Sequence, residues 1–477
     1  MVINTTLTVT DEEGSMSTQC ISRRHNFQPL GRRRLEGRFD GGHITSDAGL
    51  LLVREVAHQM SLFEELASCF DDHRKSSRVK HGLRDLLAQR ILGIVAGYED
   101  LNDHDGLRND LLIAAAVGRE DVLVPLASPS TLNRLEHGTD SASGDRYRRI
   151  ECNEEAVADL FIDLAIDRFT EQPEVIWLDF DATDDAIHGK QEGRFFHGYY
   201  KQYCYLPLYV FWDDFPLVAR LRRANQDGAA GALDELKRIV ERLRQRWPNV
   251  PIRVRADSGF ARDALFDWCE NNAVDYVIGM AKNKRLKAMV ADELEVARDL
   301  TRLSGKPTRI FKDLTYRTQK SWSRSRRVVA KAEQLVGKAN PRFVVTTLSK
   351  EQFDAKHVYE DLYAVRGDME NRIKEQQLGL FADRTSAKTM RANQLRLWFS
   401  TFAYVLLTEL RRRALVGTEL ARAQATTIRT RLIKLGAVVH QSVRRVYLSM
   451  SSSFPMAETF VAALNALNPG SRQPGWV

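Results

Sequence analysis

The sequence predicts an α/β protein built on a mixed sheet, with a helical region before the sheet and another after it. Two apolar runs, 175–178 and 252–256, each lead into an aspartate, as is typical of buried strands that end at a site. Two further strand-like runs, 202–212 and 217–224, lie between them and are joined by the turn 213–216. Because 43% of the 477 residues are hydrophobic, the chain can bury a sizeable core and form two or three domains.

The remaining core elements follow the same patterns. A helix is expected over 232–247, where Leu236, Ile239 and Leu243 recur on one face, and a second helix is expected over 261–272 before a strand at 275–280. The expected order is therefore three strands, a helix, a strand, a helix and a strand. This is the order of a ribonuclease-H-like core. The first and fourth strands are neighbours in that topology, so the aspartates that follow them should lie close together.

Three acidic residues stand in distinctive local contexts: Asp181 in VIWLDFDATDD, Asp257 in IRVRADSGF and Glu370 in YAVRGDMENRIKE. Alternation puts Asp179 on the same face of its strand as Asp181, so Asp179 is the reserve for the first position. A single aspartate at a strand end is as readily a helix cap or a turn former. Together, however, the three acids could hold two divalent ions for in-line phosphoryl displacement, and Mg²⁺ prefers such oxygen ligands.

The segment around Glu370 carries a family resemblance. Tyr363, Arg366 and Glu370 match a Tyr-x2-Arg-x3-Glu signature, and the segments 181–183 and 256–260 resemble those around the first two acids of the same family. From about residue 39 to 445, the chain therefore resembles bacterial insertion-sequence transposases of the DDE class. The family's usual lysine, seven residues after the glutamate, is replaced here by Gln377, and Lys374 is the nearest substitute.

The resemblance implies a DNA-cutting enzyme. Its expected reaction is metal-dependent strand cleavage at transposon ends followed by strand transfer into target DNA, which is cut-and-paste transposition. The three acids would bind Mg²⁺ or Mn²⁺, two ions in all, and Tyr363, Arg366 and Lys374 would contact DNA. The implied partners are double-stranded DNA at the transposon ends and target, and further copies of the chain in a homodimer or higher multimer. The implied location is the bacterial cytoplasm, at the nucleoid.

The strand, helix and charge patterns divide the chain into six expected regions. Strand-like runs at 326–335 and 342–348 indicate that the stretch before the glutamate helix is β-rich, as the resemblance also implies. The expected regions are a flexible basic arm (1–40), a helical region that would bind transposon ends (41–165), the first part of the catalytic core (170–282), a β-rich insertion (283–357), the region of the glutamate helix (358–400) and a basic helical C-terminal region (401–477).

Positive charge is concentrated near the C-terminus. The formal net charge is +7 and the pI about 9.1, and the segment 384–445 alone holds thirteen Lys and Arg against two Glu. A charge run is usually a solvated face, but charge so concentrated favours a polyanionic partner. Arg411, Arg412 and Arg413 are the candidate DNA contacts in this segment.

A second basic run contains an aromatic residue. Trp322 lies among Arg324 and Arg326 in the insertion. Basic residues interleaved with an aromatic suit the contact of a DNA backbone and an unstacked base, although a solvated face is again the alternative.

The five cysteines are far apart and form no CxxC pair, which fits a reduced cytoplasmic protein without a structural zinc site. No apolar stretch reaches the length of a transmembrane helix, and residues 1–38 lack a signal-peptide core, so no membrane partner is expected.

Two other functions fit parts of the sequence. Asp179-Phe-Asp181-Ala-Thr183 also matches the Asp-x-Asp-x-Thr of haloacid-dehalogenase-like phosphatases, whose fold requires a doubly wound parallel sheet instead of the antiparallel strands expected here. A catalytically inactive DNA-binding relic of a transposase is the third possibility, and the three intact acids speak against it.

Overall fold

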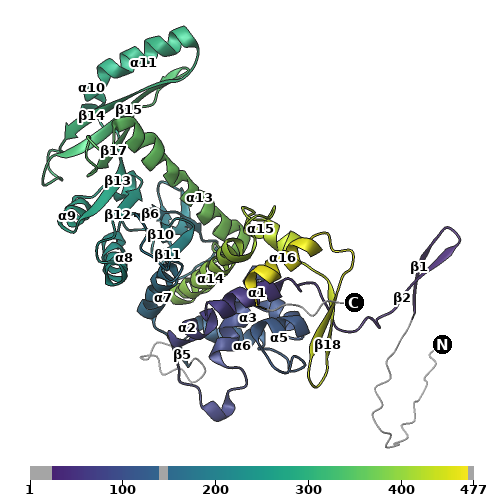
Figure 1. The fold of residues 1–477 in the computed structure, drawn as a ribbon. Coiled ribbons are helices and arrows are strands. Elements are labelled where there is room, and N and C mark those ends of the chain that lie inside the picture. Colours follow the sequence, from purple (N-terminus) through teal and green to yellow (C-terminus); the bar gives the residue numbers. More distant parts are fainter. Residues whose placement is uncertain (1–23, 139–148, 471–477) are drawn as a thin grey trace, which may run out of the picture.

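The computed structural model describes residues 24–138 and 149–470, and one large hydrophobic core runs through most of this chain (Figure 1). The helical region expected before the sheet is present, and α3 is buried along most of its length. A short two-stranded sheet joins residues far apart in this region, because β4 pairs with β5. The elements are α1 (Leu50–Gln59), α2 (Leu62–Ser68), β4 (Phe70–Asp72), η1 (Ser76–Arg78), α3 (Leu83–Ala96), η2 (Leu101–Asp103), α4 (His104–Leu107), α5 (Leu111–Val117), α6 (Pro129–His137), β5 (Ile150–Cys152) and α7 (Glu154–Ile166).

In the half of the central sheet that contains β6 and β12, the strands are neighbours as predicted. Its strands run in the order β11-β10-β6-β12-β13, and β6 is parallel to β12, with Phe180 opposite Ala256. The first and fourth strands are therefore neighbours, as expected. β10 is antiparallel to both β6 and β11. The elements are β6 (Ile176–Ala182), β10 (Leu208–Trp212), β11 (Phe215–Arg220), α8 (Ala232–Arg246), β12 (Ile252–Ala256), η3 (Ser258–Phe260), α9 (Asp263–Asn271) and β13 (Val274–Met280).

The run 202–212, expected as one strand, is two strands. Pro207 separates β9 (Gln202–Tyr205) from β10, because a proline has no N–H to donate to a strand ladder. β9 instead forms a small sheet with β7 (Asp185–Ala186) and β8 (Phe195–His197).

The insertion extends the central sheet beyond β13. β17 (Arg342–Thr346) is antiparallel to β13, followed by β15 (Arg326–Leu335) and β14 (Thr308–Tyr316), and β16 (Lys338–Ala339) folds back on β15. The expected β content is thus present. Two helices that were not expected, α10 (Lys284–Met289) and α11 (Ala291–Ser304), also lie in this region (Figure 1, top left). The apolar pattern of α11 is weak because it buries only Ala297 and Thr301.

A helical run over 355–379 carries the predicted glutamate. It comprises α12 (Ala355–His357), η4 (Val358–Tyr363), η5 (Ala364–Arg366), α13 (Gly367–Lys374) and η6 (Glu375–Gly379). The long helix α14 (Met390–Ala414) follows and contacts both β11 and the N-terminal helices α1, α3 and α6. Phe402 of α14 stacks on Phe161 of α7 at 4.3 Å between ring centroids, so α14 joins the helical region to the sheet.

The C-terminal region is not helical throughout. After α15 (Ala425–Ile428) and η7 (Arg429–Ile433), β18 (Ala437–Gln441) and β19 (Val446–Met450) form a hairpin before α16 (Ala457–Leu467). β18 also pairs with β3 (Ile44–Thr45), so a strand before α1 lies beside a strand of the C-terminal region.

A second hairpin lies within the stretch expected to be an unpatterned arm. β1 (His25–Leu30) pairs with β2 (Arg33–Gly37) through a turn in which Gly31 has a φ of 61°, a value that favours glycine. This hairpin stands apart from the rest of the molecule (Figure 1, right). The remainder of the predicted arm, residues 1–23, lies outside the described residues.

Cys69, Cys152, Cys204 and Cys269 are buried free thiols, and Cys20 lies outside the described residues. No helix in the described part of the chain combines the length and apolarity needed to cross a membrane.

Candidate active site

Asp181 and Asp257 lie at the carboxyl ends of neighbouring parallel strands. Asp181 is the sixth residue of β6, and Asp257 directly follows β12. Below them, Phe180 packs edge-on against Phe260 with ring centroids 6.0 Å apart. Asp257 also caps the turn η3, because its Oδ1 accepts a hydrogen bond of 2.8 Å from the Gly259 N–H. The cap predicted as the alternative for a strand-end aspartate is thus present, and it fixes the carboxylate at the edge of the sheet.

Glu370 reaches the same place from α13. Asp181, Asp257 and Glu370 line one cavity of about 550 Å³. Arg366 stands between two of them, with its Nη1 3.5 Å from Asp181 Oδ1 and its Nη2 3.3 Å from Glu370 Oε1. Three acids that are 189 residues apart at the extremes are therefore brought to one cavity by the sheet and the helix packed on it.

The carboxylates in the cavity repel one another, and this repulsion changes the pKa of their neighbours. Burial raises the pKa of Asp181 to about 6; Arg366 opposes this, and the negative charges of Asp257 and Glu370 add to it. The pKa of Arg366 is raised, because the charges of Asp181 and the other acids outweigh its burial. A site that raises the pKa of a carboxyl group in this way favours a further positive charge.

The donor chemistry of the cavity suits a hard divalent ion. Its three carboxylates are the oxygen ligands that Mg²⁺ and Mn²⁺ prefer. Within residues 24–138 and 149–470, however, no three Asp, Glu, His or Cys side chains stand close enough to hold one ion. The Arg366 guanidinium lies between Asp181 and Glu370, so Arg366 neutralises these carboxylates in this conformation.

Asp179, the reserve for the first position, has a different environment. It is 1% exposed and is held by Arg255 of β12, whose Nε and Nη2 lie 2.6 and 2.8 Å from its two carboxylate oxygens. Arg255 also donates to the Leu362 carbonyl. Asp179 does not line the cavity, which argues for Asp181 as the first acid. It also argues against a phosphatase in which Asp179 attacks substrate, as does the antiparallel strand β10 beside β6.

The other residues of the signature surround the same cavity. Arg366 and Lys374 line it together with Gln377, whose Nε2 donates to the Asp184 carbonyl at 3.2 Å. Tyr363 does not line the cavity but is largely buried beside it, and burial raises its pKa.

Sequence reasoning missed several residues that line the cavity. His197 ends β8, and Tyr199 and Tyr200 lie in the turn that follows it. Tyr199 is 83% exposed, which makes it an accessible aromatic ring beside the acids. The signal that could have found these residues is the aromatic run FFHGYY, which the strand pattern left without a role.

Gly279 of β13 was also missed, and its role is steric. A Cβ at this position would collide with the Tyr363 hydroxyl and lie 3.1 Å from the Ser258 nitrogen and 3.3 Å from the Asp257 carbonyl carbon. Gly279 therefore allows Tyr363 to pack against the loop that carries the second acid.

We expect Gly279→Ala to reduce DNA strand cleavage by roughly 100-fold, because a shift of about 1 Å in a catalytic group can cost that much. A gel assay of cleavage measures the effect. Gly436→Ala is the matched control, since a Cβ there meets nothing within 4 Å. Normal cleavage by Gly279→Ala would show that Tyr363 and the Asp257 loop move aside without consequence.

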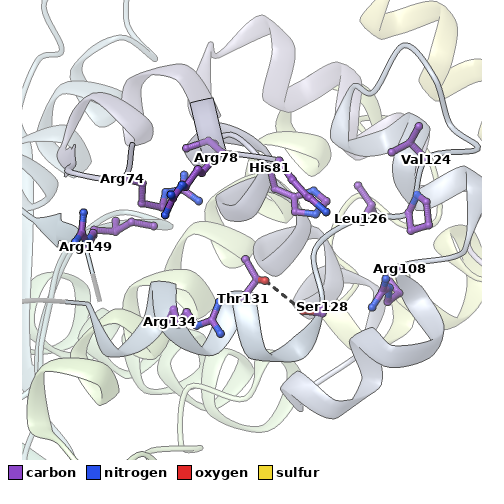
Figure 2. Close-up of a pocket in the computed structure, with 14 residues that line it drawn as sticks. Arg74, Arg78, His81, Arg108, Val124, Leu126, Ser128, Thr131, Arg134 and Arg149 are labelled. Atoms are coloured by element: carbon purple, nitrogen blue, oxygen red, sulfur yellow. Dashed lines mark hydrogen bonds between the residues drawn. The ribbon is translucent and has the colours of Figure 1, made fainter. Parts of the chain in front are cut away.

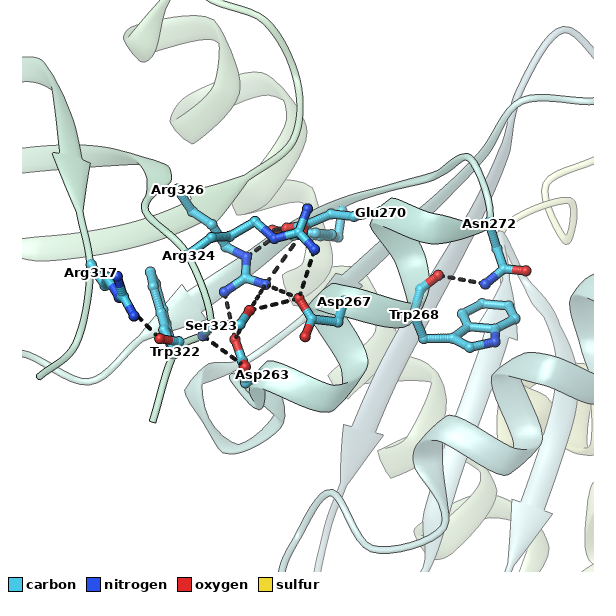
Figure 3. Close-up of polar contacts among 11 residues, drawn as sticks. Asp263, Asp267, Trp268, Glu270, Asn272, Arg317, Trp322, Ser323, Arg324 and Arg326 are labelled. Atoms are coloured by element: carbon cyan, nitrogen blue, oxygen red, sulfur yellow. Dashed lines mark hydrogen bonds and ion pairs between the residues drawn. The ribbon is translucent and has the colours of Figure 1, made fainter. Parts of the chain in front are cut away.

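The predicted DNA contacts in the insertion require correction (Figure 3). Trp322 is 5% exposed and packs edge-on against Phe266 and Tyr316, at 5.5 and 5.7 Å between ring centroids. It is a core residue and cannot stack on a base in this structure. Of the three residues, only Arg324 is well exposed, and it lies 3.4 Å from Asp267.

Arg326 is buried in an ion cluster. Its guanidinium is 3% exposed and contacts Asp263 at 2.6 Å, Asp267 at 2.7 Å and Glu270 at 2.6 Å, all on α9 (Figure 3). The three carboxylates neutralise the positive charge of the Arg326 guanidinium, so this charge is not free to bind DNA. The sequence could not reveal this pairing, because α9 precedes Arg326 by more than 50 residues.

The three arginines at the end of α14 form ion pairs within the protein. Arg411 pairs with Glu375 and donates to the Ala423 carbonyl. Arg412 and Arg413 both pair with Glu409, which is fully buried, at 2.6 and 2.8 Å. These pairs give the three arginines a structural role in this conformation, and their contact with DNA stays a prediction. Three other basic residues of the segment are also held within the protein: Arg396 pairs with Glu136, Arg429 donates to three backbone carbonyls and Lys434 pairs with Asp47.

We expect Glu409→Gln to lower the free energy of unfolding by about 1–3 kcal/mol, because Arg168, Arg412 and Arg413 lose their shared carboxylate. Burial opposes ionisation of Glu409, but its hydrogen bonds with Arg412 and Arg413 and the charge of Arg168 lower its pKa overall. Its contribution is thus present above the ordinary value of 4.5 and is lost as the pH falls through the lower folded-state pKa.

Urea denaturation at pH 7 and below measures this effect. Glu419→Gln is the control, since Glu419 is 51% exposed and lies 3.7 Å from Arg431, a geometry worth at most about 1 kcal/mol. Unchanged stability together with a flatter salt dependence of DNA binding in a variant of Arg411, Arg412 and Arg413 would support their role as DNA contacts.

Comparisons with known proteins identify the family of the chain. The family model "Transposase DDE domain group 1" matches residues 27–471. No curated protein matches the chain. The solved structures that match include a cryo-EM structure of the piggyBac transposase synaptic complex with hairpin DNA, with 11% sequence identity, a TM-score of 0.41, and coverage of 82% of this chain and 80% of that chain. Because the family model spans nearly the whole sequence, this chain belongs to the transposase family with a group 1 DDE domain.

Proposed function

We propose that this chain cleaves DNA strands at the ends of a mobile element and joins the released 3′-hydroxyl groups to target DNA, by a cut-and-paste route. The observation that carries the proposal is the convergence of Asp181, Asp257 and Glu370 on one cavity, together with Arg366 and Lys374. The strand order β11-β10-β6-β12-β13, with both aspartates at adjoining strand ends, supports the assignment of a ribonuclease-H-like core.

The three acids are the proposed metal-binding residues. Two Mg²⁺ or Mn²⁺ ions bound there would supply the positive charge that activates the attacking oxygen and stabilises the leaving oxygen of the phosphodiester. Asp257 is held in place by the Gly259 N–H, and Asp181 by the strand end. Arg366 neutralises Asp181 and Glu370 before DNA and metal are present, and would release them when a phosphate offers it a better partner.

Arg366, Tyr363 and Lys374 are the proposed contacts of the phosphates next to the cleaved bond. Lys374 is one helical turn from Glu370 and lines the cavity, so it can take the place of the lysine that the family has where this chain has Gln377. The helical region 41–165 is the proposed reader of the element's ends, in a homodimer or higher multimer on double-stranded DNA in a bacterial cell.

We expect Arg366→Lys to reduce cleavage and strand transfer by tenfold or more, about 1.4 kcal/mol or above, although the charge is kept. A guanidinium can bind two oxygens at once, whereas an ammonium offers a point charge. Tyr363→Phe should have a smaller effect, and Lys374→Ala measures how far the substitute lysine is needed. Arg372→Lys is the matched control, since Arg372 lies on the same helix but donates to the Asp213 carbonyl. If Arg366→Ala cleaves and joins DNA at the normal rate, the helix is only a scaffold for Glu370.

The proposed function is tested with purified protein and labelled duplex DNA that carries the element's own ends. Cleavage and joining that require Mg²⁺ or Mn²⁺ and stop on chelation support it. Specific binding of the ends without cleavage, at any concentration of either ion, would favour the inactive relic. Hydrolysis of small phosphate esters that depends on Asp179 would favour the phosphatase.

A further inference from the structure

A concentration of positive charge lies outside the catalytic cavity. A second cavity, of about 740 Å³, opens in the N-terminal helical region. We call it the basic cavity, because none of the described residues that line it is Asp or Glu, while the following basic residues do line it: Arg74, Arg78, Lys80, His81, Arg108, Arg134 and Arg149 (Figure 2).

These residues are separate in sequence and are gathered by the fold. Arg78 ends η1, Arg108 follows α4 and Arg134 lies on α6. Pairing of β4 with β5 brings the segment that begins at residue 74 beside the one that ends at residue 149, and the Arg149 carbonyl accepts a hydrogen bond of 2.8 Å from the His73 N–H. The charge cluster is therefore a product of tertiary structure.

Much of this charge has no acidic partner within residues 24–138 and 149–470. Among the described residues, Arg78, Lys80, Arg108 and Arg134 form no ion pair, whereas Arg74 is held by Asp72 at 2.6 Å. The Nε atom of Arg108 is buried without a hydrogen-bond partner. Burial lowers the pKa of His81, and the charges of Arg119 and Arg108 contribute to this shift. Like charges held this close repel one another, so an anion in the basic cavity would relieve both the repulsion and the unpaired donor.

The arrangement fits a row of phosphates better than a single one. Arg74, Arg78 and Arg149 lie toward one end of the basic cavity, while Arg108 and Ser128 lie toward the other (Figure 2). The first turn of α6 points into the space between them, since Ser128 and Thr131 both line it. The Ser128 hydroxyl bonds to those of Ser130 and Thr131, at 3.0 and 3.2 Å, and caps no backbone N–H of the helix. Cations spread along a wall match the repeated charge of a nucleic-acid backbone.

We propose that the basic cavity is a second DNA contact, which holds successive backbone phosphates of a duplex whose cleavage site occupies the catalytic cavity. The inference rests on the proposed function, because it takes DNA as the substrate. Contacts of this kind position the duplex but do not read its sequence. Arginine suits them because it can hold two phosphate oxygens at once.

The test removes two exposed cations of the basic cavity, Arg78 and Arg134, by the double substitution Arg78→Gln/Arg134→Gln. The control, Arg298→Gln/Lys338→Gln, removes the same net charge from exposed positions in the insertion. Binding of a fluorescent duplex with the element's end, and of a scrambled duplex of equal length, is measured by anisotropy over a series of salt concentrations. We expect the test variant to bind both duplexes more weakly and to lose about 1.8 units of log-log salt slope, at about 0.9 per contact, while the control keeps its slope.

The outcomes separate the inference from the function on which it rests. An unchanged slope, or an equal loss in the control, overturns the basic cavity as a DNA site, provided that the wild type still cleaves the element's ends. Failure of the wild type to bind or cleave DNA overturns the proposed function as well. A parallel measurement follows the Tm with inorganic phosphate at constant ionic strength. If phosphate raises the Tm of the wild type but not of the test variant, and the DNA slopes are equal, the cavity takes a free anion and the DNA assignment is wrong.

Discussion

Asp181→Asn, Asp257→Asn and Glu370→Gln should each reduce strand cleavage and strand transfer by roughly 1,000-fold or more. Each change removes one carboxylate charge from the catalytic cavity and keeps the shape of the side chain. A metal site that loses a charged ligand forfeits several kcal/mol of transition-state stabilisation, and each 1.36 kcal/mol is tenfold in rate. Binding of the element's ends should be largely retained, because the phosphate contacts stay in place. Gel assays of cleavage and joining, beside anisotropy for binding, measure the two effects separately.

The substitutions of the two aspartates should leave the fold intact. The pKa of Asp181 is already raised to about 6 by burial and by its acidic neighbours, so Asp181→Asn should not destabilise the fold. Asp257→Asn keeps an oxygen that can accept the bond from Gly259. Asp299→Asn is the matched control, since Asp299 is 63% exposed on α11 and, among the residues that the structure describes, pairs only with Arg302. If Asp181→Asn cleaves normally and Asp179→Asn does not, the assignment of the first acid is wrong.

Arg255→Met should lower the free energy of unfolding by about 3–5 kcal/mol, the usual cost of removing one partner from a buried ion pair. The substitution leaves Asp179, which is 1% exposed, without its bidentate partner and also removes the donor to the Leu362 carbonyl. Urea denaturation followed by circular dichroism measures the loss. The double variant Asp179→Leu/Arg255→Met should recover part of it, because an apolar pair of similar volume carries no unpaired charge.

The pH dependence of Arg255→Met gives a second check. Burial raises the pKa of Asp179 and Arg255 lowers it, so removal of Arg255 should raise it further. The folded variant then binds a proton that the unfolded chain, with an ordinary value of 3.8, releases. Its stability should therefore fall as the pH rises from 3.8 through the higher folded-state pKa. A stable Arg255→Met variant that loses cleavage alone would show that this pair serves the chemistry and not the fold.

Local pattern was enough to predict the order of the core elements and the place of the acids. Apolar runs that end in Asp181 and Asp257 predicted two strand ends, and the strand-strand-strand-helix-strand order predicted that these ends adjoin. The spacing from Tyr363 to Glu370 predicted a helix, which the structure contains. These features depend on side-chain alternation and helical period, which neighbouring residues determine.

The sequence by itself thus determined the order of the core strands and the place of the three acids, whereas the use of each charge was decided by tertiary structure. By alternation, Asp179 and Asp181 lie on the same face of their strand. Arg255 from the neighbouring strand binds Asp179 alone, which keeps Asp179 away from the cavity. Arg326 and Arg411 are ordinary basic residues in the sequence, but carboxylates on α9 and η6 neutralise them. The basic cavity arises because β4 and β5 pair across about 80 residues. Whether a charge meets a carboxylate or remains free for DNA depends on such distant pairings, and no local pattern records them.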